Sequence, residues 1–348
     1  GKPYPAQIRV EENWPDLITA GGGSLRIQLH DGMILEMSEF SIQHPQARNT
    51  LRGWLVLMAL RLEDILAPRT SYLNLMINDK PMGVCKIEEH LNKQLLESQG
   101  RRAGPIVKFE EDLAPLARFE YPSMHRTDVE DSVVSWDVVD KANPVVFGMT
   151  RLTRVDPFVQ QLDKVLAQLG AVQRAVVAAL GQRDRAAALL TRAAVQDQAI
   201  EAIFDVELNA AAHALTSVLA NKHPLTWDNV RFYCNPVTSK LEPVIFAVDN
   251  RGYDSEQLPV IWDGPFVCQL LLKNVHYSEA FFRYLARYCE DTYLDDMLVE
   301  LGPELGRYER ALEAEGLLSG AHRVPQLVND FRQRQQYLRE LLEPRVAV

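Results

Sequence analysis

SYLNLMINDKPMGVCKIEEH, residues 71–90, contains the clearest structural signal in the chain. Residues 72–77 are rich in apolar and aromatic side chains, which is typical of a strand. Asn78 and Asp79 then provide a turn, and residues 84–87 begin a returning strand. The stretch therefore predicts a β-hairpin.

The flanking residues extend this pattern in both directions. Upstream, the alternation of apolar and polar side chains over residues 25–29, followed by His-Asp-Gly at 30–32, predicts a strand and a turn. Residues 48–62 have apolar side chains at spacings of three and four, which predicts a helix with one apolar face. Downstream, a helix is expected over residues 88–99 and a short strand over residues 106–109.

The second half of the chain is mainly helical in its periodicity. Asp156 and Pro157 resemble a helix cap followed by proline at the first helical position, and they begin a long predicted helix. Another helix is expected over residues 205–220. Residues 230–234 and 243–248 are strand-like, are joined by a turn, and predict a second hairpin. Further helices are predicted at residues 278–301, 304–316 and 325–342.

This order of elements predicts an α+β fold rather than a wound parallel sheet. We expect two lobes with a cleft between them, where ligands commonly bind. The N-terminal, strand-rich lobe would comprise residues 1–115, and the mainly helical C-terminal lobe residues 116–348. The second lobe would include a helical insertion at about residues 156–220.

Composition excludes several classes of protein. The chain has 348 residues, of which 47% are hydrophobic, so it can form a core without disulfide or metal support. Its 37 Lys+Arg and 47 Asp+Glu give a formal charge of −10, which disfavours binding to nucleic acid or anionic lipid. No run approaches the ~18–20 apolar residues that a membrane span requires. The cysteines are too scattered for structural zinc or a disulfide framework, and we expect buried free thiols at Cys85, Cys234, Cys268 and Cys289.

Three glycines precede the first strand of the alternating pattern. Gly21, Gly22 and Gly23, followed by Ser24, could let backbone amides approach a phosphate closely. The segment has neither a Walker A lysine nor a GxGxxG pattern, so a flexible turn is the alternative interpretation.

Lys108 is the first candidate for binding an anionic ligand, because it lies between apolar neighbours in a predicted strand. Glu89, at the entry of the preceding predicted helix, is a candidate carboxylate partner. Kinases use a lysine held by a carboxylate to fix nucleotide phosphates. The alternative is an edge-strand lysine and a solvated glutamate, and Lys86 is the other candidate lysine.

His223, Asn229 and Asp249 form the densest polar constellation. Asn229 opens the first strand of the second hairpin and Asp249 follows the other strand, so both side chains are expected at one end of it. Such an oxygen pair suits Mg²⁺ or Mn²⁺ rather than zinc. The alternative is that these are ordinary turn residues beside a structural histidine.

Several segments together resemble the CotH family, the spore-coat-type atypical protein kinases. Residues 71–90 resemble that family's strand pair, and residues 91–109, ending Ile-Val-Lys-Phe, continue the similarity. Residues 223–233 and 240–246 resemble its downstream block, and the similarity spans roughly residues 20–290. Ser24 and Arg48 fall in the segments that resemble the family's opening strands and the arginine that starts its first helix.

The resemblance implies a reduced kinase-like fold and a phosphotransferase that depends on ATP and on Mg²⁺ or Mn²⁺. Its substrate would be Ser or Thr of a protein, possibly a Ser-rich coat protein, at a spore or cell surface rather than in the cytoplasm alone. By the same resemblance Asn229 and Asp249 would bind the metal. The cofactor-binding residues would be Lys108, Glu89, Ser24 and Arg48.

Two departures from the family pattern bear on catalysis. Ala247 stands where the family commonly has an acid, and no catalytic aspartate is evident several residues before Asn229. His223, as a neutral imidazole, or Asp228 could accept the hydroxyl proton instead. The alternative function is a nucleotide-binding pseudokinase or an interaction module, in which the helical insertion could pair with a second copy of the chain.

Overall fold

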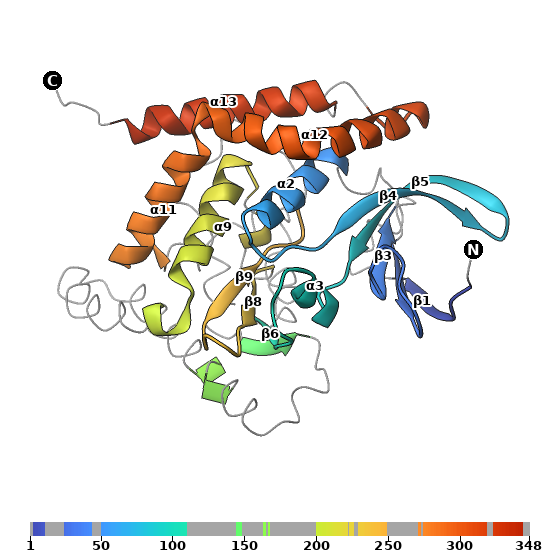
Figure 1. The fold of residues 1–348 in the computed structure, drawn as a ribbon, viewed down its shortest axis with the longest axis horizontal. Helices are drawn as coiled ribbons and strands as arrows, with labels where there is room; N and C mark the ends of the chain where they lie inside the picture. Colours follow the sequence, from blue (N-terminus) through green and yellow to red (C-terminus); the bar gives the residue numbers. More distant parts are fainter. Residues whose placement is uncertain are drawn as a thin grey trace, which may run out of the picture.

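The computed structural model describes twelve ranges of the chain. These are residues 3–10, 24–43, 50–109, 144–147, 163–164, 166–167, 200–221, 223–225, 229–248, 271–272, 274–318 and 323–343. The predicted α+β class is confirmed: the N-terminal part holds a five-stranded antiparallel sheet, and helices dominate the C-terminal part (Figure 1).

The first sheet has the strand order β1-β2-β3-β5-β4, and every neighbouring pair is antiparallel. Its strands are β1 (Ala6–Val10), β2 (Leu25–Leu29), β3 (Glu39–Gln43), β4 (Thr70–Ile77) and β5 (Lys80–Glu89). The predicted hairpin at residues 71–90 is therefore confirmed. Alternation along the strands gathers a small apolar cluster that includes Phe40, Ile42, Cys85 and Ile87 on one face.

The opposite face of the first sheet is polar. Gln43 of β3 lies directly across from Lys86 of β5, and Ser41 lies across from Glu88. Arg26 of β2 pairs with Ser41 and so lies on the same face. Several of these polar side chains are buried, so this face points into the protein rather than into solvent.

The second sheet joins segments that are far apart in the sequence. Its order is β7-β6-β8-β9, all antiparallel. The strands are β6 (Ile106–Phe109), β7 (Pro144–Phe147), β8 (Arg231–Cys234) and β9 (Leu241–Val244). The predicted hairpin around residues 230–248 is present, but its second strand begins and ends earlier than expected. The sequence predicts residues 106–109 as part of the N-terminal lobe. In the structure these residues form β6, which pairs directly with β8 of this hairpin.

Helices surround the second sheet, as Figure 1 shows, with α12 and α13 side by side along one side of the molecule. Most of their buried apolar side chains belong to one large core. The helices are α2 (Thr50–Leu62), α3 (Lys93–Ser98), α9 (Val206–Val218), the short 3-10 helix η3 (His223–Leu225), α11 (Val275–Tyr288), α12 (Asp291–Ala314) and α13 (Val324–Leu342).

Tyr308 of α12 connects this helical part to the first sheet. Its ring makes edge contacts with Trp54 of α2 and Tyr72 of β4, at centroid distances of 5.4 and 4.8 Å. Its hydroxyl lies 2.7 Å from Ser71 Oγ. One side chain therefore joins α12, α2 and β4.

Three of the predicted helix boundaries are wrong. The helix expected over residues 88–99 begins only at Lys93, because Glu89 still pairs with Phe40 in the sheet and Asn92 caps α3. Tertiary pairing thus overrides the local preference of Glu-Glu for helix. In the C-terminal part, the helix predicted over residues 278–301 is interrupted at Cys289–Glu290, between α11 and α12. The boundary predicted between residues 301 and 304 is absent, because α12 continues through Pro303.

Other expectations are confirmed for the described residues. The helices predicted at 48–62, 205–220 and 325–342 correspond to α2, α9 and α13. Cys85, Cys234 and Cys289 are buried free thiols, whereas Cys268 lies outside the described residues. The long helix expected from Asp156 also lies mostly outside them. Across the described ranges, no helix combines the length and the apolar character that a bilayer span needs.

Candidate functional site

Five of the eight predicted site residues lie in the described part of the chain. His223, Asn229, Lys108, Glu89 and Ser24 can be placed. The other three, Arg48, Asp228 and Asp249, lie outside the described residues, although the chain is described up to Val248, one residue before Asp249.

The structure brings His223 and Asn229 together. His223 begins η3, and Asn229 Nδ2 lies 3.3 Å from the carbonyl oxygen of His223 and 3.4 Å from each ring nitrogen. Both residues are half-buried. The contact holds the Asn229 amide and the imidazole side by side just before β8, where a hard oxygen ligand and a proton acceptor could act on one substrate.

Lys108 lies near the same end of the second sheet. It is directly opposite Arg231 of β8, two residues after Asn229, so Lys108 and Arg231 project from the same face of neighbouring strands. Arg231 is buried, its guanidinium lies 5.1 Å from the centre of the Phe246 ring, and burial lowers its pKa to about 9. Two cationic side chains in one partly desolvated place favour an anionic ligand.

Lys86, the alternative lysine, forms an ion pair with the carboxylate of Glu88. Its ammonium lies 2.5 Å from Glu88 Oε2, and its side chain is only 3% exposed. A Cβ built on Gly53 of α2 would lie 4.0 Å from Lys86 Nζ and 3.6 Å from the carbonyl oxygen of Val248. The Lys86 ammonium and the carbonyl of Val248, the residue before Asp249, therefore both lie beside Gly53.

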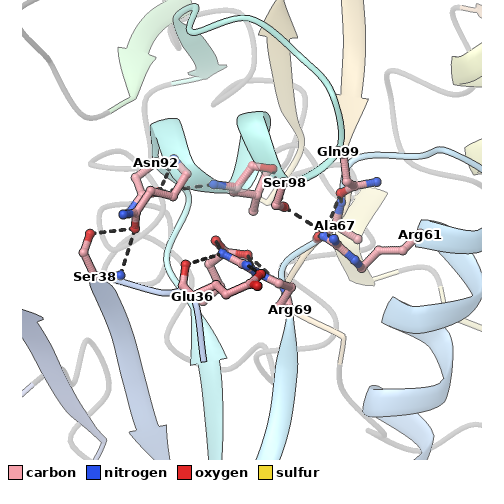
Figure 2. Close-up of polar contacts among 11 residues, drawn as sticks. Glu36, Ser38, Arg61, Ala67, Arg69, Asn92, Ser98 and Gln99 are labelled. Carbon is pink, nitrogen blue, oxygen red and sulfur yellow. Dashed lines mark hydrogen bonds and ion pairs between the residues drawn. The ribbon is translucent and has the colours of Figure 1, made fainter. Parts of the chain in front are cut away.

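Glu89 has a different partner from the one expected. Its fully buried carboxylate forms an ion pair with Arg69, with Nη2 at 2.6 Å from Oε1 and Nε at 3.0 Å from Oε2. Arg69 also binds Glu36 in the connection between β2 and β3, as Figure 2 shows. Glu89 thus ties β5, β4 and this connection together, which is a structural role.

A polar cluster around α3 fixes the approach to β6 (Figure 2). Gln99 Oε1 accepts hydrogen bonds from Arg61 Nη1 at 2.9 Å and from the backbone N–H of Ala67 at 3.0 Å. Gln99 Nε2 donates to the carbonyl oxygen of Ile65 at 2.9 Å. The end of α3 is therefore locked against the segment after α2, seven residues before β6 begins.

Ser24 directly precedes β2, and two-residue alternation assigns it to the face that carries Arg26. Arg26 binds Glu39 through Nε at 2.8 Å and approaches His90 Nδ1 at 3.2 Å. This is the same polar face that carries Lys86. Ser24 and Lys86 therefore share a sheet face, on different strands.

The sequence does not mark several buried polar residues, among them Arg231, Gln43 and Asn221. Arg231, Gln43 and Asn221 are 4%, 8% and 1% exposed. Gln43 alternates with apolar residues in its strand, a pattern that equally describes a solvent-facing side. Arg231 opens the strand Arg-Phe-Tyr-Cys, and no local signal marks its burial or that of Asn221. Their burial depends on which segments cover them.

The resemblance implies a divalent metal, and only one of its expected oxygen ligands lies in the described part of the chain. Asn229 supplies the type of oxygen that Mg²⁺ or Mn²⁺ binds, whereas the expected carboxylates Asp228 and Asp249 lie outside the described residues. Within the described ranges, no three His, Cys, Asp or Glu side chains gather in a group that could hold a metal ion.

Comparison of the chain with protein-family models and with curated proteins finds no match.

Proposed function

We propose that this protein is a CotH-like phosphotransferase that uses ATP and Mg²⁺ or Mn²⁺ to phosphorylate Ser or Thr of a protein, with a two-lobed kinase-like fold. The observation that carries the proposal is the gathering of cationic side chains around the segment after β9. Arg231 contacts Phe246 of this segment, Lys108 lies opposite Arg231, and Lys86 lies with Val248 beside Gly53 of α2. Cations from two sheets suit a triphosphate.

In this proposal the chain's own residues position the reactants. Lys108 and Lys86 bind phosphate oxygens, and the ion pair with Glu88 orients Lys86. Asn229, with Asp249, would hold the divalent cation, which supplies charge neutralisation for the transferring phosphoryl group. His223, held beside Asn229, accepts the proton of the attacking hydroxyl, and Asp228 is the other candidate for that role.

Nucleotide binding is tested first, by thermal unfolding with ATP and millimolar Mg²⁺ or Mn²⁺. We expect the unfolding midpoint to rise, and the rise to shrink strongly in Lys86→Met and Lys108→Met. Lys93→Met is the matched control, because Lys93 is an exposed lysine on α3 whose pair with Glu97 is a surface contact. Absence of a rise with every nucleotide tested would refute the proposal.

Phosphotransfer is tested next, by following labelled phosphate from ATP to a coexpressed protein. His223→Gln is expected to reduce transfer by about 10²–10⁴-fold, the usual contribution of a general base, with nucleotide binding retained. Transfer that is unchanged in this variant would assign the base to Asp228 or another group.

Ala247 favours a second candidate function, a pseudokinase that binds nucleotide without transferring phosphate. Ala247 replaces the acid of the family pattern, yet its backbone is left-handed with φ of 53°, a conformation that Asp adopts more readily than Ala. A nucleotide-dependent rise in the unfolding midpoint without label transfer would favour this function. Transfer gained in Ala247→Asp would then identify the missing acid as the cause.

A further inference from the structure

We infer that Asn221 binds the phosphate–metal part of the nucleotide, which adds a ligand-contacting residue to the site. The inference rests on the proposed function. It begins from burial: Asn221 is 1% exposed, and neither Oδ1 nor Nδ2 has a hydrogen-bond partner in the part of the chain that the structure describes. Buried amides are nearly always hydrogen-bonded, so an exception calls for a partner of another kind.

Hydrogen bonds hold the backbone of the turn that carries Asn221 in place. The C-terminus of α9 closes with a Schellman arrangement, in which Asn221 N–H donates to the Thr216 carbonyl at 2.8 Å and Ala220 N–H to Ser217 at 3.3 Å. Ala220 is left-handed, with φ of 50°. Arg52 of α2 also donates to the Leu219 carbonyl at 2.9 Å, which pins this turn to the neighbouring helix.

Asn221 also adjoins the proposed site from two directions. Along the chain it leads directly into η3, where His223 contacts Asn229. Across the fold, Arg52 holds the turn before Asn221, and the next residue of α2, Gly53, lies beside Lys86 and Val248. One turn of α2 therefore connects Asn221 with the lysine and with the segment leading to Asp249.

Gln43 provides an independent observation at the same place. Its Oε1 is buried and has no hydrogen-bond partner among the described residues, and it lies directly across the sheet from Lys86. Gln43 thus adjoins Lys86, which lies beside Gly53, and the neighbouring residue Arg52 holds the turn before Asn221. This is the pattern expected when polar groups are kept for a ligand.

The chemistry of an amide fits the nucleotide's phosphate end. Nδ2 can donate to a phosphate oxygen, while Oδ1 can bind a hard divalent cation or accept from its water. Both unmet groups are then satisfied at once.

The test compares Asn221→Leu with Asn209→Leu. Leucine has a similar volume but no polar atoms, so removing an unsatisfied buried amide should raise the unfolding midpoint of the unliganded protein, by about 2 °C or more. The same change should abolish most of the rise caused by ATP with Mg²⁺. Asn209 is the matched control: it is a buried asparagine of α9 whose Nδ2 donates to the Asp205 and Leu241 carbonyls, so its replacement should lower the midpoint.

A lower midpoint in unliganded Asn221→Leu, as in Asn209→Leu, would show that the amide has a structural role and would overturn the inference. A full ATP-induced rise in Asn221→Leu, with the wild-type rise present, would overturn it alone. Absence of that rise in the wild type would remove the proposed function and the inference together. Asn221→Ala, assayed by titration with ATP and Mg²⁺, gives the same comparison should leucine prevent folding, and at least a tenfold weaker affinity is expected.

Discussion

Gly53 and Gly104 are two glycines with opposite surroundings. A Cβ on Gly53 would meet Val248 and Lys86 at 3.6–4.0 Å, which is ordinary contact. A Cβ on Gly104 would lie 2.6 Å from Tyr233 Cε2 and 2.8 Å from the Cys234 carbonyl oxygen, where the backbone cannot give way easily. The space beside a glycine, rather than glycine itself, decides what a substitution does.

We expect Gly53→Ala to stabilise the protein by up to about 1 kcal/mol, because alanine is the better helix former. Gly104→Ala should destabilise it by about 1–3 kcal/mol through overpacking. Urea unfolding of both variants measures the two effects. Equal losses in both would show that α2 has no room beside Lys86.

His213 predicts a pH dependence. It is buried in α9, its Nδ1 lies 3.1 Å from Tyr277 Oη, and burial lowers its pKa from 6.5 to about 3. Between about pH 6.5 and pH 3, His213 binds a proton in the unfolded chain but stays neutral in the folded chain. The free energy of unfolding should therefore fall as the pH drops from about 6.5 towards 3, by at most about 1.4 kcal/mol per pH unit from this group.

The measurement is urea unfolding of the wild type and His213→Gln between pH 7 and pH 4. The variant lacks the titrating group, so its stability should decline less steeply. Parallel slopes in the two proteins would assign the pH dependence to other groups.

Residue by residue, the sequence allowed the type of several candidate ligands to be predicted but not their partners. Their positions in predicted strands made Lys108 a candidate and Lys86 the alternative. The sequence could not show that Glu88 would bind Lys86 or that Arg69 would bind Glu89. Ion pairing depends on strand register and on side-chain direction, which neighbouring residues in the chain do not determine.

Among the elements, α3 is the most dependent on its cap. The helix has only six residues, and Asn92 accepts hydrogen bonds from the backbone N–H groups of Gln94 and Leu95. A helix of this length is not stable in isolation. Its position relies on this cap, on Gln99 and on the burial of Leu95 and Leu96.

Asn92→Ala should therefore destabilise the protein by about 1 kcal/mol, and Asn92→Ser, which preserves a capping oxygen, by much less. Thermal or urea unfolding distinguishes the two. Similar losses in both variants would indicate that the packing around Asn92 matters more than its cap.

Elements with strong local periodicity could be predicted well, and their ends could not. Helical periodicity was enough for α2, α9 and α13, alternation for β2, and apolar and aromatic content for β4. The end of β5 was missed because Glu88 and Glu89 favour helix locally, while their partners on β3 and β4 keep them extended. The sequence also predicts a helix boundary between residues 301 and 304, whereas α12 continues through Pro303.

At the level of the whole molecule, Tyr308 is the clearest link between the helices and the first sheet. Tyr308→Ala removes ring contacts with Trp54 and Tyr72 and should destabilise the protein by about 3–5 kcal/mol. Tyr308→Phe keeps the ring and loses the hydroxyl contacts with Ser71 and Glu304, so a smaller loss of about 1–2 kcal/mol is expected.

Amide hydrogen exchange tests where the loss falls. In Tyr308→Ala, amides of β4 and β5 should lose protection before those of α9 and α11, because the sheet is then less firmly attached. Uniform loss of protection across both parts would show that they unfold as one unit regardless of Tyr308.

The overall class could be predicted because runs of strands and runs of helices are visible in the sequence. The second sheet could not be assembled in this way, because nothing near Lys108 indicates that it pairs with Arg231, 123 positions later. For the same reason the candidate site was expected to draw Lys108 from one lobe and Asn229 from the other. In the structure their strands are neighbours.

The pairing of β6 with β8 has a consequence for biosynthesis. When the ribosome has released residues 106–109, one of their two neighbouring strands, at 231–234, has not yet been made. The nascent N-terminal portion can assemble its own five strands early, but β6 cannot complete its pairing, or fully bury Ile106 and Val107, until β8 is made. Closure over so long a loop is slow, so this interval is when chaperone protection would matter most.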